Sequence, residues 1–218
     1  MTPADLSRTA RRLYAAGPAV GRTVQSLRPY ICPFDRLLPL IPPGVSVLDV
    51  GCGSGLLTVL AADRIDVGRV VGFDSSPSAI GLAHVAAAAL AVAGRPVPEY
   101  IPLDVTADWP AGLFDVVAVV DVLHHIPPAA QRSVVEQAAA KVAPGGRLVY
   151  KDIGARPRWR AAMNRLHDLV MARQWVRYAE ADTVREWVEA CGLVAGPVER
   201  INTLWYGHDL LVAERPAG

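Results

Sequence analysis

A glycine-rich turn directly after a short apolar run limits this chain to a small group of folds. Residues 45–50 read as a buried strand, and residues 56–65 as the helix that follows it. Between them stand Gly51, Gly53 and Gly55. Glycines at such a turn permit positive φ and let the backbone approach a ligand closely. The amide groups at the start of the next helix favour an anionic group, and doubly wound α/β sheets bind nucleotides at this position.

Strands and helices alternate from residue 45 onward, which predicts a parallel sheet covered on both faces. Further strands are expected at 69–74, 99–104, 114–120, 147–153, 193–201 and 207–213, and further helices at 77–92, 127–142 and 183–191. Residues 1–44 form a helical, basic N-terminal cap that closes on a Pro-Pro-Gly breaker, and residues 45–218 form the main domain. The predicted fold class is α/β: a doubly wound, Rossmann-like, mostly parallel seven-stranded sheet with helices on both faces.

The composition fits a single packed domain. The 218 residues are 52% hydrophobic and 20% charged, and the formal net charge of +1 gives no overall field that attracts nucleic acid. Cys32, Cys52 and Cys191 are far apart and show no CxxC spacing, which argues against a disulfide framework and a zinc site. The N-terminus lacks the apolar stretch of a secretory signal, and the apolar segment 116–122 is too short to span a bilayer. We therefore expect a cytoplasmic compartment, no metal and no nucleic-acid partner.

The spacing of the glycines separates two classes of cofactor. The pattern is G-x-G-x-G, and Leu56 stands where the dinucleotide fingerprint requires its third glycine. Asp49 stands two places before the first glycine. Both features disfavour a nucleotide-binding oxidoreductase.

Later segments extend this pattern into a family resemblance. They are Asp74, Leu103-Asp104-Val105, Phe114-Asp115-Val116-Val117, Leu123-His124-His125-Ile126 and Pro144-Gly145-Gly146-Arg147-Leu148. In order and spacing, residues 45–153 resemble the motifs of class I S-adenosylmethionine-dependent methyltransferases, particularly the small-molecule subgroup that includes quinone-biosynthesis methyltransferases. The remainder of the chain resembles that family only loosely.

The resemblance implies that S-adenosylmethionine binds at the glycine loop and that S-adenosylhomocysteine is the product. The implied cofactor-binding residues are Asp49, Gly51, Cys52, Gly53, Gly55, Asp74, Ser75, Asp104, Val105 and Asp121. Asp49 would hold the ammonium group, or it bonds only loop amides. Asp74 would accept hydrogen bonds from the ribose hydroxyls, or it caps the next helix. Asp104 and Val105 would meet the adenine, whereas Asp121 could touch the methionine portion or the acceptor.

Three candidate catalytic residues are His125, His124 and Asp152. A base is needed only if the acceptor must lose a proton, and histidine suits that task at neutral pH. Both histidines follow the fourth expected strand, where the mouth of the family's active site lies, so shaping the pocket is the alternative role. Asp152 could accept a proton or orient the acceptor, or it forms a solvated ion pair with Lys151. Weaker candidates outside the best-matched region are His167, Tyr178 and His208.

Two basic clusters belong to segments that pack over the acceptor entrance in the subgroup that the chain resembles. The first comprises Arg8, Arg11, Arg12, Arg22 and Arg28, and the second comprises Lys151, Arg156, Arg158, Arg160 and Arg165. A helical insertion at about 154–181 would cover the acceptor with apolar side chains. We therefore expect an anionic acceptor, or one tethered to an acidic carrier protein or a membrane surface through Arg8, Arg11 and Arg12. Solvated arginines on exposed helix faces are the alternative.

The predicted function is therefore S-adenosylmethionine-dependent methyl transfer to a small acceptor of apolar, aromatic or acyl type. One alternative is a non-catalytic S-adenosylmethionine-binding partner or regulatory protein, which should show damage to the glycine loop or Asp74; neither is damaged. The other is an RNA methyltransferase, but residues 121–124 lack the Asn-Pro-Pro-Tyr type signature of enzymes that methylate base amines. The acceptor, the methylated atom and the oligomeric state are left open.

Overall fold

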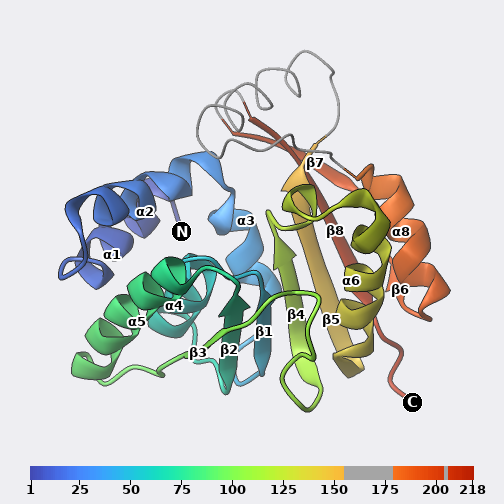
Figure 1. Cartoon of the computed structure of the whole chain (residues 1–218), viewed down its shortest axis with the longest axis horizontal. Helices are drawn as coiled ribbons and strands as arrows, with labels where there is room; N and C mark the ends of the chain where they lie inside the picture. The colour runs from blue at the N-terminus through green and yellow to red at the C-terminus, as the bar shows by residue number, and fades with distance from the viewer. Residues whose placement is uncertain (155–178, 204–205) are drawn as a thin grey trace.

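The computed structural model describes residues 1–154, 179–203 and 206–218. Over these residues the strands form one mixed sheet in the order β3-β2-β1-β4-β5-β8-β6, with β7 paired to β8 (Figure 1). The strands are β1 (Val47–Val50), β2 (Val70–Asp74), β3 (Glu99–Pro102), β4 (Phe114–Val120), β5 (Val142–Ile153), β6 (Val194–Ala195), β7 (Glu199–Thr203) and β8 (Tyr206–Glu214). Strands β1 to β5 are parallel and β6 to β8 pair antiparallel, so the predicted fold class is confirmed.

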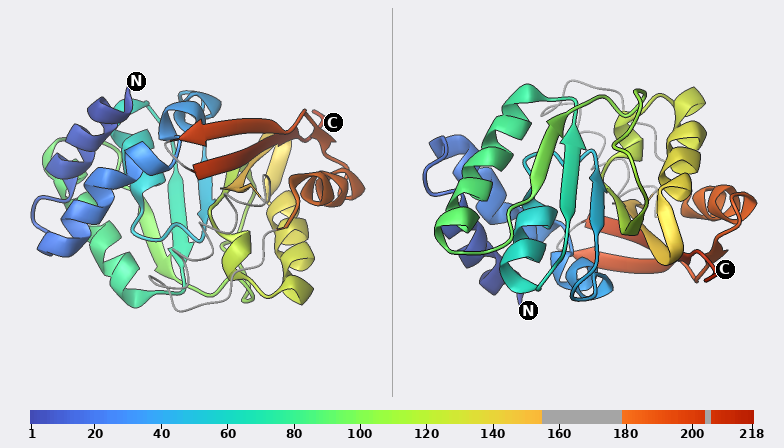
Figure 2. Two further views of the ribbon diagram at one scale, coloured as in Figure 1. Left: turned by 90° about the horizontal axis from the view of Figure 1, so that it is seen from above. Right: turned by 90° about the horizontal axis from the view of Figure 1, so that it is seen from below.

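Helices cover both faces of the sheet (Figure 2). They are α1 (Pro3–Leu13), α2 (Ala19–Ile31), α3 (Phe34–Leu37), α4 (Leu56–Arg64), α5 (Pro77–Val92), α6 (Pro128–Ala140) and α8 (Ala181–Ala190), with short 3-10 turns η1 (Leu38–Leu40) and η2 (Leu123–His125). Helices α4 and α5 pack on one face together with α1 and α3, and α6 and α8 pack on the other. The connection from β2 to α5 follows the expected chemistry, because Ser76 caps the helix and Pro77 opens it.

Strand β4 shows why the sheet has two hydrophobic cores. Its side chains alternate, so Val116 and Ala118 face α4 and α5 while Val117 and Val119 face α6 and α8. All four are buried, as expected for a central parallel strand. A charge on either face of this strand would therefore lie inside a core.

The order of the strands reverses beside β1. Strand β1 pairs with β2 on one side and with β4 on the other, and both pairings are parallel. The loops after β1 and β4 therefore leave the same edge of the sheet in opposite directions and open a crevice between them. Such a switch point is where open α/β sheets bind ligands.

Several predicted boundaries are wrong. Strand β3 ends at Pro102, so Asp104 and Val105 lie in the loop that follows it. Strand β5 begins at Val142, and the segment 143–146, expected to be a helix stop, lies within this strand. Pro144 is accommodated there because the register with β4 shifts between Phe114 and Val116. The expected closing strand 193–201 is divided into β6 and β7.

The first 44 residues are mainly helical, as expected, and they pack on the main domain. Helix α1 contacts α2, α3, α4 and α5, and its Leu6, Ala10 and Leu13 are buried in the same core as α4. Most of the predicted insertion at 154–181, with His167, Tyr178 and the arginines at 156, 158, 160 and 165, lies outside the described residues. Within the described ranges, every helix is too short or too polar to cross a membrane.

Candidate cofactor and acceptor site

A cavity of about 700 Å³ lies at the switch point, where β1, β2 and β4 end. Its volume is typical of small-molecule sites. It is lined by Gln25, Arg28, Phe34, Asp49, Gly51, Cys52, Gly53, Ser54, Leu56, Leu57, Asp74, Ser75, Asp104, Val105, Thr106, Val120, Asp121, Val122, His125, Ile126 and Pro127. All the predicted cofactor-binding residues except Gly55 are in this lining, so residues predicted from separate motifs converge on one space.

The glycine loop needs glycine for steric reasons. Gly51 and Gly55 have φ of 63° and 75°, in the left-handed region that other residues rarely adopt. A Cβ atom on Gly51 would lie 2.8 Å from Val122, and one on Gly55 would collide with the ring of Tyr100. Gly55 is the N-cap of α4 and shapes the loop without lining the cavity.

Two tyrosines hold the loop from behind, and no motif predicts this role for either of them. The Tyr14 hydroxyl donates to the Ser54 carbonyl at 2.7 Å, and Tyr14 is fully buried at the end of α1. The Thr58 hydroxyl donates to the Gly55 carbonyl at 2.8 Å and lies 2.6 Å from the Tyr100 hydroxyl. The N-terminal cap is thereby linked directly to the loop.

Asp74 is fixed at the end of β2 by two backbone donors. The Gly53 amide donates to its Oδ2 at 2.9 Å, and the Ser76 amide donates to its Oδ1 at 2.8 Å. Each carboxylate oxygen has a second lone pair, so both can accept a further hydrogen bond from a vicinal diol. The alternative role of Asp74, capping the next helix, falls mainly to Ser76, whose hydroxyl accepts the Ala79 amide at the start of α5. Asp74 contributes by accepting the backbone amide of Ser76.

Asp104 and Val105 form the next part of the wall, after β3. Asp104 Oδ1 accepts hydrogen bonds from the Thr106 hydroxyl at 2.7 Å and the Thr106 amide at 2.9 Å. These bonds lower the pKa of Asp104, so it is a ready acceptor for an amino group. The Val105 carbonyl accepts the Trp109 indole N–H at 2.9 Å, which anchors this loop to the core.

Asp49 is buried at the base of the cavity. Its pKa is raised to about 7, mainly by burial and also by the neighbouring carboxylate of Asp74, while Arg28 opposes both effects. A nearby cation lowers the pKa of such a carboxyl group and so favours its ionised form. The position is therefore suited to an ammonium group.

Asp121 lies at the end of β4 in an unusual conformation. Its φ of 58° is the single positive value among the non-glycine residues that the structure describes. Its Oδ1 lies 2.5 Å from Lys151 Nζ, and its Oδ2 lies 3.4 Å from the Arg28 guanidinium. Burial alone would raise the pKa of Asp121, but Lys151 and Arg28 bring it well below its ordinary value. Strained residues of this kind cluster at functional sites.

The alternative role of Asp152, a solvated ion pair with Lys151, is wrong. Neighbouring residues of a strand point to opposite faces, so Lys151 meets Asp121 and Asp152 meets His124. Neither pair is solvated, because Lys151, Asp152 and His124 are all buried. The ion-pair partner of a residue in a strand depends on the face of the sheet to which its side chain points. Two residues that are adjacent in the sequence point to opposite faces, so they rarely pair with each other.

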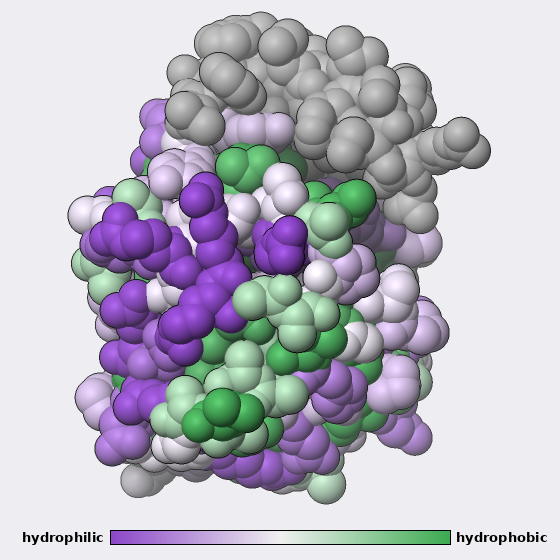
Figure 3. Space-filling model, turned by 90° about the vertical axis from the view of Figure 1, so that its left-hand side faces the viewer, coloured by the Kyte–Doolittle hydropathy of each residue, from purple (hydrophilic) through white to green (hydrophobic). Residues whose placement is uncertain are grey.

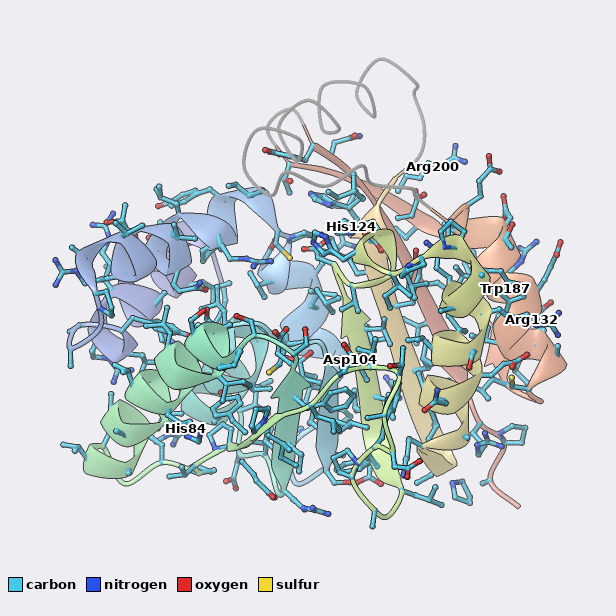
Figure 4. The ribbon with its side chains drawn as sticks, in the orientation of Figure 1. His84, Asp104, His124, Arg132, Trp187 and Arg200 are labelled. Atoms are coloured by element: carbon cyan, nitrogen blue, oxygen red, sulfur yellow. The ribbon has the colours of Figure 1, made fainter. Side chains whose placement is uncertain are left out.

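The two adjacent histidines have different surroundings. His125 lines the cavity, whereas His124 is not in the described lining and places its Nδ1 2.5 Å from Asp152 Oδ1. The His124 backbone amide also donates to Asp152 Oδ2 at 3.2 Å. The two imidazole rings lie 4.0 Å apart between centroids, and Figure 4 shows His124 beside the ends of β4 and β5. His208 is not in the described lining, and its Nε2 is 2.8 Å from the Ile31 carbonyl. Burial and the nearby Lys151 lower its pKa to about 4.

Arg28, Gln25 and Phe34 reach the cavity from the N-terminal cap. Arg28 was expected near the acceptor entrance as part of the first basic cluster, whereas Gln25 and Phe34 were not predicted. No spacing rule connects residue 28 with a loop beginning at residue 51, because the contact depends on how the cap packs. The cavity is thus lined both by the loops that follow the strands and by the cap.

The glycine loop and the carboxylates around the cavity form a Rossmann-like site that suits a nucleoside carrying an amino acid. This is the architecture of class I S-adenosylmethionine-dependent methyltransferases. A family model described as a methyltransferase domain matches residues 24–195, and the chain belongs to this family. S-adenosylmethionine is the cofactor of that class, and the donor set described above fits it: carboxylates for the ammonium and the ribose, and a loop of backbone amides.

Curated relatives match about half of the chain. It is 36% identical over 120 residues to a ribosomal protein L11 methyltransferase of Burkholderia mallei (strain NCTC 10229), a match covering 53% of this chain and 34% of the relative. It is 32% identical over 111 residues to a ubiquinone biosynthesis O-methyltransferase of Idiomarina loihiensis, covering 50% of this chain and 43% of the relative. The chain therefore matches less than half the length of these relatives.

A solved structure supports the fold over nearly the whole chain. Magnesium protoporphyrin IX methyltransferase from Synechocystis PCC 6803, with bound S-adenosylhomocysteine, superimposes with a TM-score of 0.69 at 21% identity. The match covers 95% of this chain and 93% of that chain.

Proposed function

We propose that this protein transfers a methyl group from S-adenosylmethionine to a small apolar, aromatic or acyl-type acceptor that is anionic or carries an anionic group. One observation carries the proposal: a single cavity is lined by the glycine loop, Asp74 and Asp104 and also by Arg28 and His125. The first group supplies donors and acceptors suited to the cofactor, and the second supplies a cation and a titratable ring.

Each polar group of the cofactor has a partner among the residues that line the cavity. Asp49 would hold the ammonium, Asp74 the ribose hydroxyls, and Asp104 with Val105 the adenine. Ser75, Cys52 and the loop amides would complete the enclosure. When bound there, the cofactor supplies a methyl group already activated by its sulfonium.

The acceptor end must then position a nucleophile and, where needed, receive its proton. Correct positioning alone can lower the barrier by about 7–11 kcal/mol in favourable cases. His125 is the candidate that lines the cavity, so we assign it the proton transfer or the shaping of the acceptor pocket. His124, held through Nδ1 by Asp152, is the second candidate, since its Nε2 then carries the basic lone pair.

Side chains of the lining support this acceptor class. Phe34 and Ile126 are apolar, and Arg28 adds a positive charge, since its partner Asp121 is also paired with Lys151. A small molecule with an apolar body and an anionic group complements that lining. The relative named for ubiquinone biosynthesis supports a small-molecule acceptor, whereas the relative named for ribosomal protein L11 supports a protein as the second candidate.

Calorimetry on the purified chain tests the cofactor end. S-adenosylhomocysteine should bind at one saturable site, Asp74→Ala should weaken binding strongly, and NAD should give no heat. Binding that is unaffected by Asp74→Ala would contradict the assignment.

Turnover tests the acceptor end. S-adenosylmethionine with a labelled methyl group is incubated with phenolic, carboxylic and acyl compounds, with ribosomal protein L11 and with RNA as comparisons. Label on small anionic aromatic or acyl compounds is the expected result. Label on protein or RNA alone would favour the alternatives, and cofactor binding without any turnover would favour a regulatory role.

A further inference from the structure

Gln25 is a buried polar side chain whose carboxamide has no hydrogen-bond partner among the residues that the structure describes. Its exposed fraction is 5%. Ser26, the next residue of α2, is equally buried, but its hydroxyl donates to the Thr23 carbonyl at 2.8 Å. Buried amides are nearly always hydrogen-bonded, because losing water without gaining a new partner costs free energy. Gln25 therefore needs a partner that the described part of the chain does not supply.

The Gln25 side chain opens into the cavity rather than into a sealed core. Gln25 belongs to the lining of the cavity, and neither of its polar side-chain atoms is among the fully enclosed, unpartnered atoms of the described residues. A carboxamide in this position can donate two hydrogen bonds and accept two more. A molecule bound in the cavity can therefore supply the missing partner.

Arg28 lies three residues after Gln25, so both side chains extend from one side of α2. It lines the same cavity. Its Nη2 lies 3.4 Å from Asp121 Oδ2, whereas Oδ1 of the same carboxylate lies only 2.5 Å from Lys151 Nζ. Two positive charges thus share one negative charge, and the Arg28 guanidinium keeps further N–H donors for an anion.

The position of Arg28 is distinctive within the first basic cluster. The other four members are exposed: Arg8, Arg11, Arg12 and Arg22. On the side of the molecule where α1 and α2 lie, hydrophilic side chains gather at the surface (Figure 3). Arg28 is therefore the member of this cluster that adds positive charge to the cavity itself.

Helix α2 is held near both of its ends. Near its start, Gly21 leaves room for Leu82 of α5, because a Cβ atom at Gly21 would lie 2.8 Å from Leu82 Cδ2. At its end, the Ile31 carbonyl accepts the Thr203 hydroxyl at 2.5 Å and lies 2.8 Å from His208 Nε2. The segment of α2 between these two contacts is thereby fixed against the cavity that it lines.

We propose that Gln25 and Arg28 form a carboxylate-binding site in the wall of the cavity. The Gln25 amide group donates to one carboxylate oxygen, and the Arg28 guanidinium donates to the other and balances its charge. The carboxylate belongs either to the amino-acid end of the cofactor or to the acceptor. Asp49, whose pKa Arg28 lowers, is near enough to receive the ammonium group of the same amino acid. The site rests on the proposed function and deepens it, because Gln25 then selects ligands that carry a carboxylate.

Calorimetry with a matched pair of ligands tests the site. S-adenosylhomocysteine is compared with its decarboxylated form, which keeps the ammonium group and lacks only the carboxylate. Gln25→Met keeps the length of the side chain without its polar atoms. It should weaken S-adenosylhomocysteine about tenfold or more and change the decarboxylated ligand by less than about twofold. Its melting temperature should not fall, because the carboxamide has no partner to lose in the free protein.

A second variant and a matched control use the charge. Gln25→Glu should weaken S-adenosylhomocysteine more than Gln25→Met does, because two carboxylates would then face each other. Val24→Glu places the same charge on the preceding residue of α2, whose exposed fraction is 45%. This control should bind both ligands like the unaltered protein.

The kinetics of methyl transfer identify the source of the carboxylate. If Gln25→Met binds S-adenosylhomocysteine normally but raises the KM of a carboxylate-bearing acceptor about tenfold, the acceptor supplies the carboxylate. The proposal is overturned if neither the affinity nor the KM changes. It is also overturned if both calorimetric ligands weaken equally, since the variant then acts through the shape of the cavity.

The unaltered protein separates this proposal from the proposed function. If it binds neither ligand, the proposed function is contradicted, and the carboxylate site is overturned with it. If it binds S-adenosylhomocysteine and the Gln25 variants behave identically to it in binding and turnover, only the carboxylate site is overturned.

Discussion

Lys151 is fully buried, and its Nζ lies 2.5 Å from Asp121 Oδ1. Because the pair joins β5 to the loop after β4, it fixes the strained backbone of Asp121 at the edge of the cavity. Removing one partner of a buried ion pair leaves an uncompensated charge and costs about 3–5 kcal/mol. Lys151→Met should lower the free energy of unfolding by that amount, measured by denaturant titration. The double variant Lys151→Met, Asp121→Asn should recover a large part of the loss, and no recovery would show that the pair does not act as a unit.

Binding of the cofactor should depend on pH through Asp49. Its pKa of about 7 in the folded protein lies above its ordinary value of 3.8, so the carboxyl group is largely protonated at pH 6. An ammonium group needs the ionised form, so affinity for S-adenosylhomocysteine should rise as pH increases through 7. Calorimetry at a series of pH values measures this, and Asp49→Asn should flatten the profile.

The same group affects the stability of the free protein. Between pH 4 and pH 7 the folded state binds a proton at Asp49 that the unfolded state has released. Stability should therefore decline as pH rises through this window, and Asp49→Asn should remove this part of the decline. Denaturant midpoints across the window give the measurement, and identical slopes for both proteins would contradict the expectation.

Arg28 should bind the carboxylate of the cofactor or of the acceptor, and a truncated ligand distinguishes the two. Arg28→Gln should weaken S-adenosylhomocysteine about tenfold or more if it holds the amino-acid carboxylate. Methylthioadenosine, which lacks that carboxylate, should then bind both proteins equally. If both ligands bind the variant normally while the acceptor KM rises, Arg28 serves the acceptor.

Gly55→Ala should damage the glycine loop. The left-handed φ alone costs about 1–2 kcal/mol for a residue with a Cβ atom, and the contact with Tyr100 adds to it. We expect a lower melting temperature together with weaker S-adenosylhomocysteine binding. Gly81→Ala is the matched control, because Gly81 lies inside α5 with open space around its Cβ position. It should raise stability by about 0.5–1 kcal/mol and leave binding unchanged.

Kinetic measurements should distinguish the roles of His124 and His125. His125→Asn should lower kcat about 100-fold if it handles a proton, while the affinity for S-adenosylhomocysteine stays within a few-fold. Asp152→Asn should act more weakly, through the orientation of His124. A larger loss in Asp152→Asn than in His125→Asn would move the proton transfer to His124.

The cofactor end of the site was predictable because its signals are local. The first glycine follows β1 directly, Asp74 is the last residue of β2, and Asp104 lies two residues after β3. Parallel strands bring their carboxyl ends to one edge of the sheet. The length of β5 was not predictable, because Pro144 and two glycines read as a stop, and only the register shift against β4 accommodates them.

The other end of the site depends on contacts between distant segments. Arg28 reaches Asp121 across 93 residues, and Tyr14 reaches Ser54 across 40. Neither contact leaves a periodic or spaced pattern in the sequence. The pairing of Lys151 with Asp121 likewise depends on which face of β5 each side chain occupies, and that is set by the register of the whole sheet.

The division of the cavity between the sheet and the N-terminal cap has an evolutionary consequence. Substitutions at positions 25, 28 and 34 can alter the shape and charge of one wall while Asp74, Asp104 and the glycine loop stay intact. Under the proposed function, acceptor preference can therefore diverge through Gln25 and Phe34 while the glycine loop, Asp74 and Asp104 are kept. Grafting the cap of this chain onto a related domain would be a compact way to transplant its selectivity.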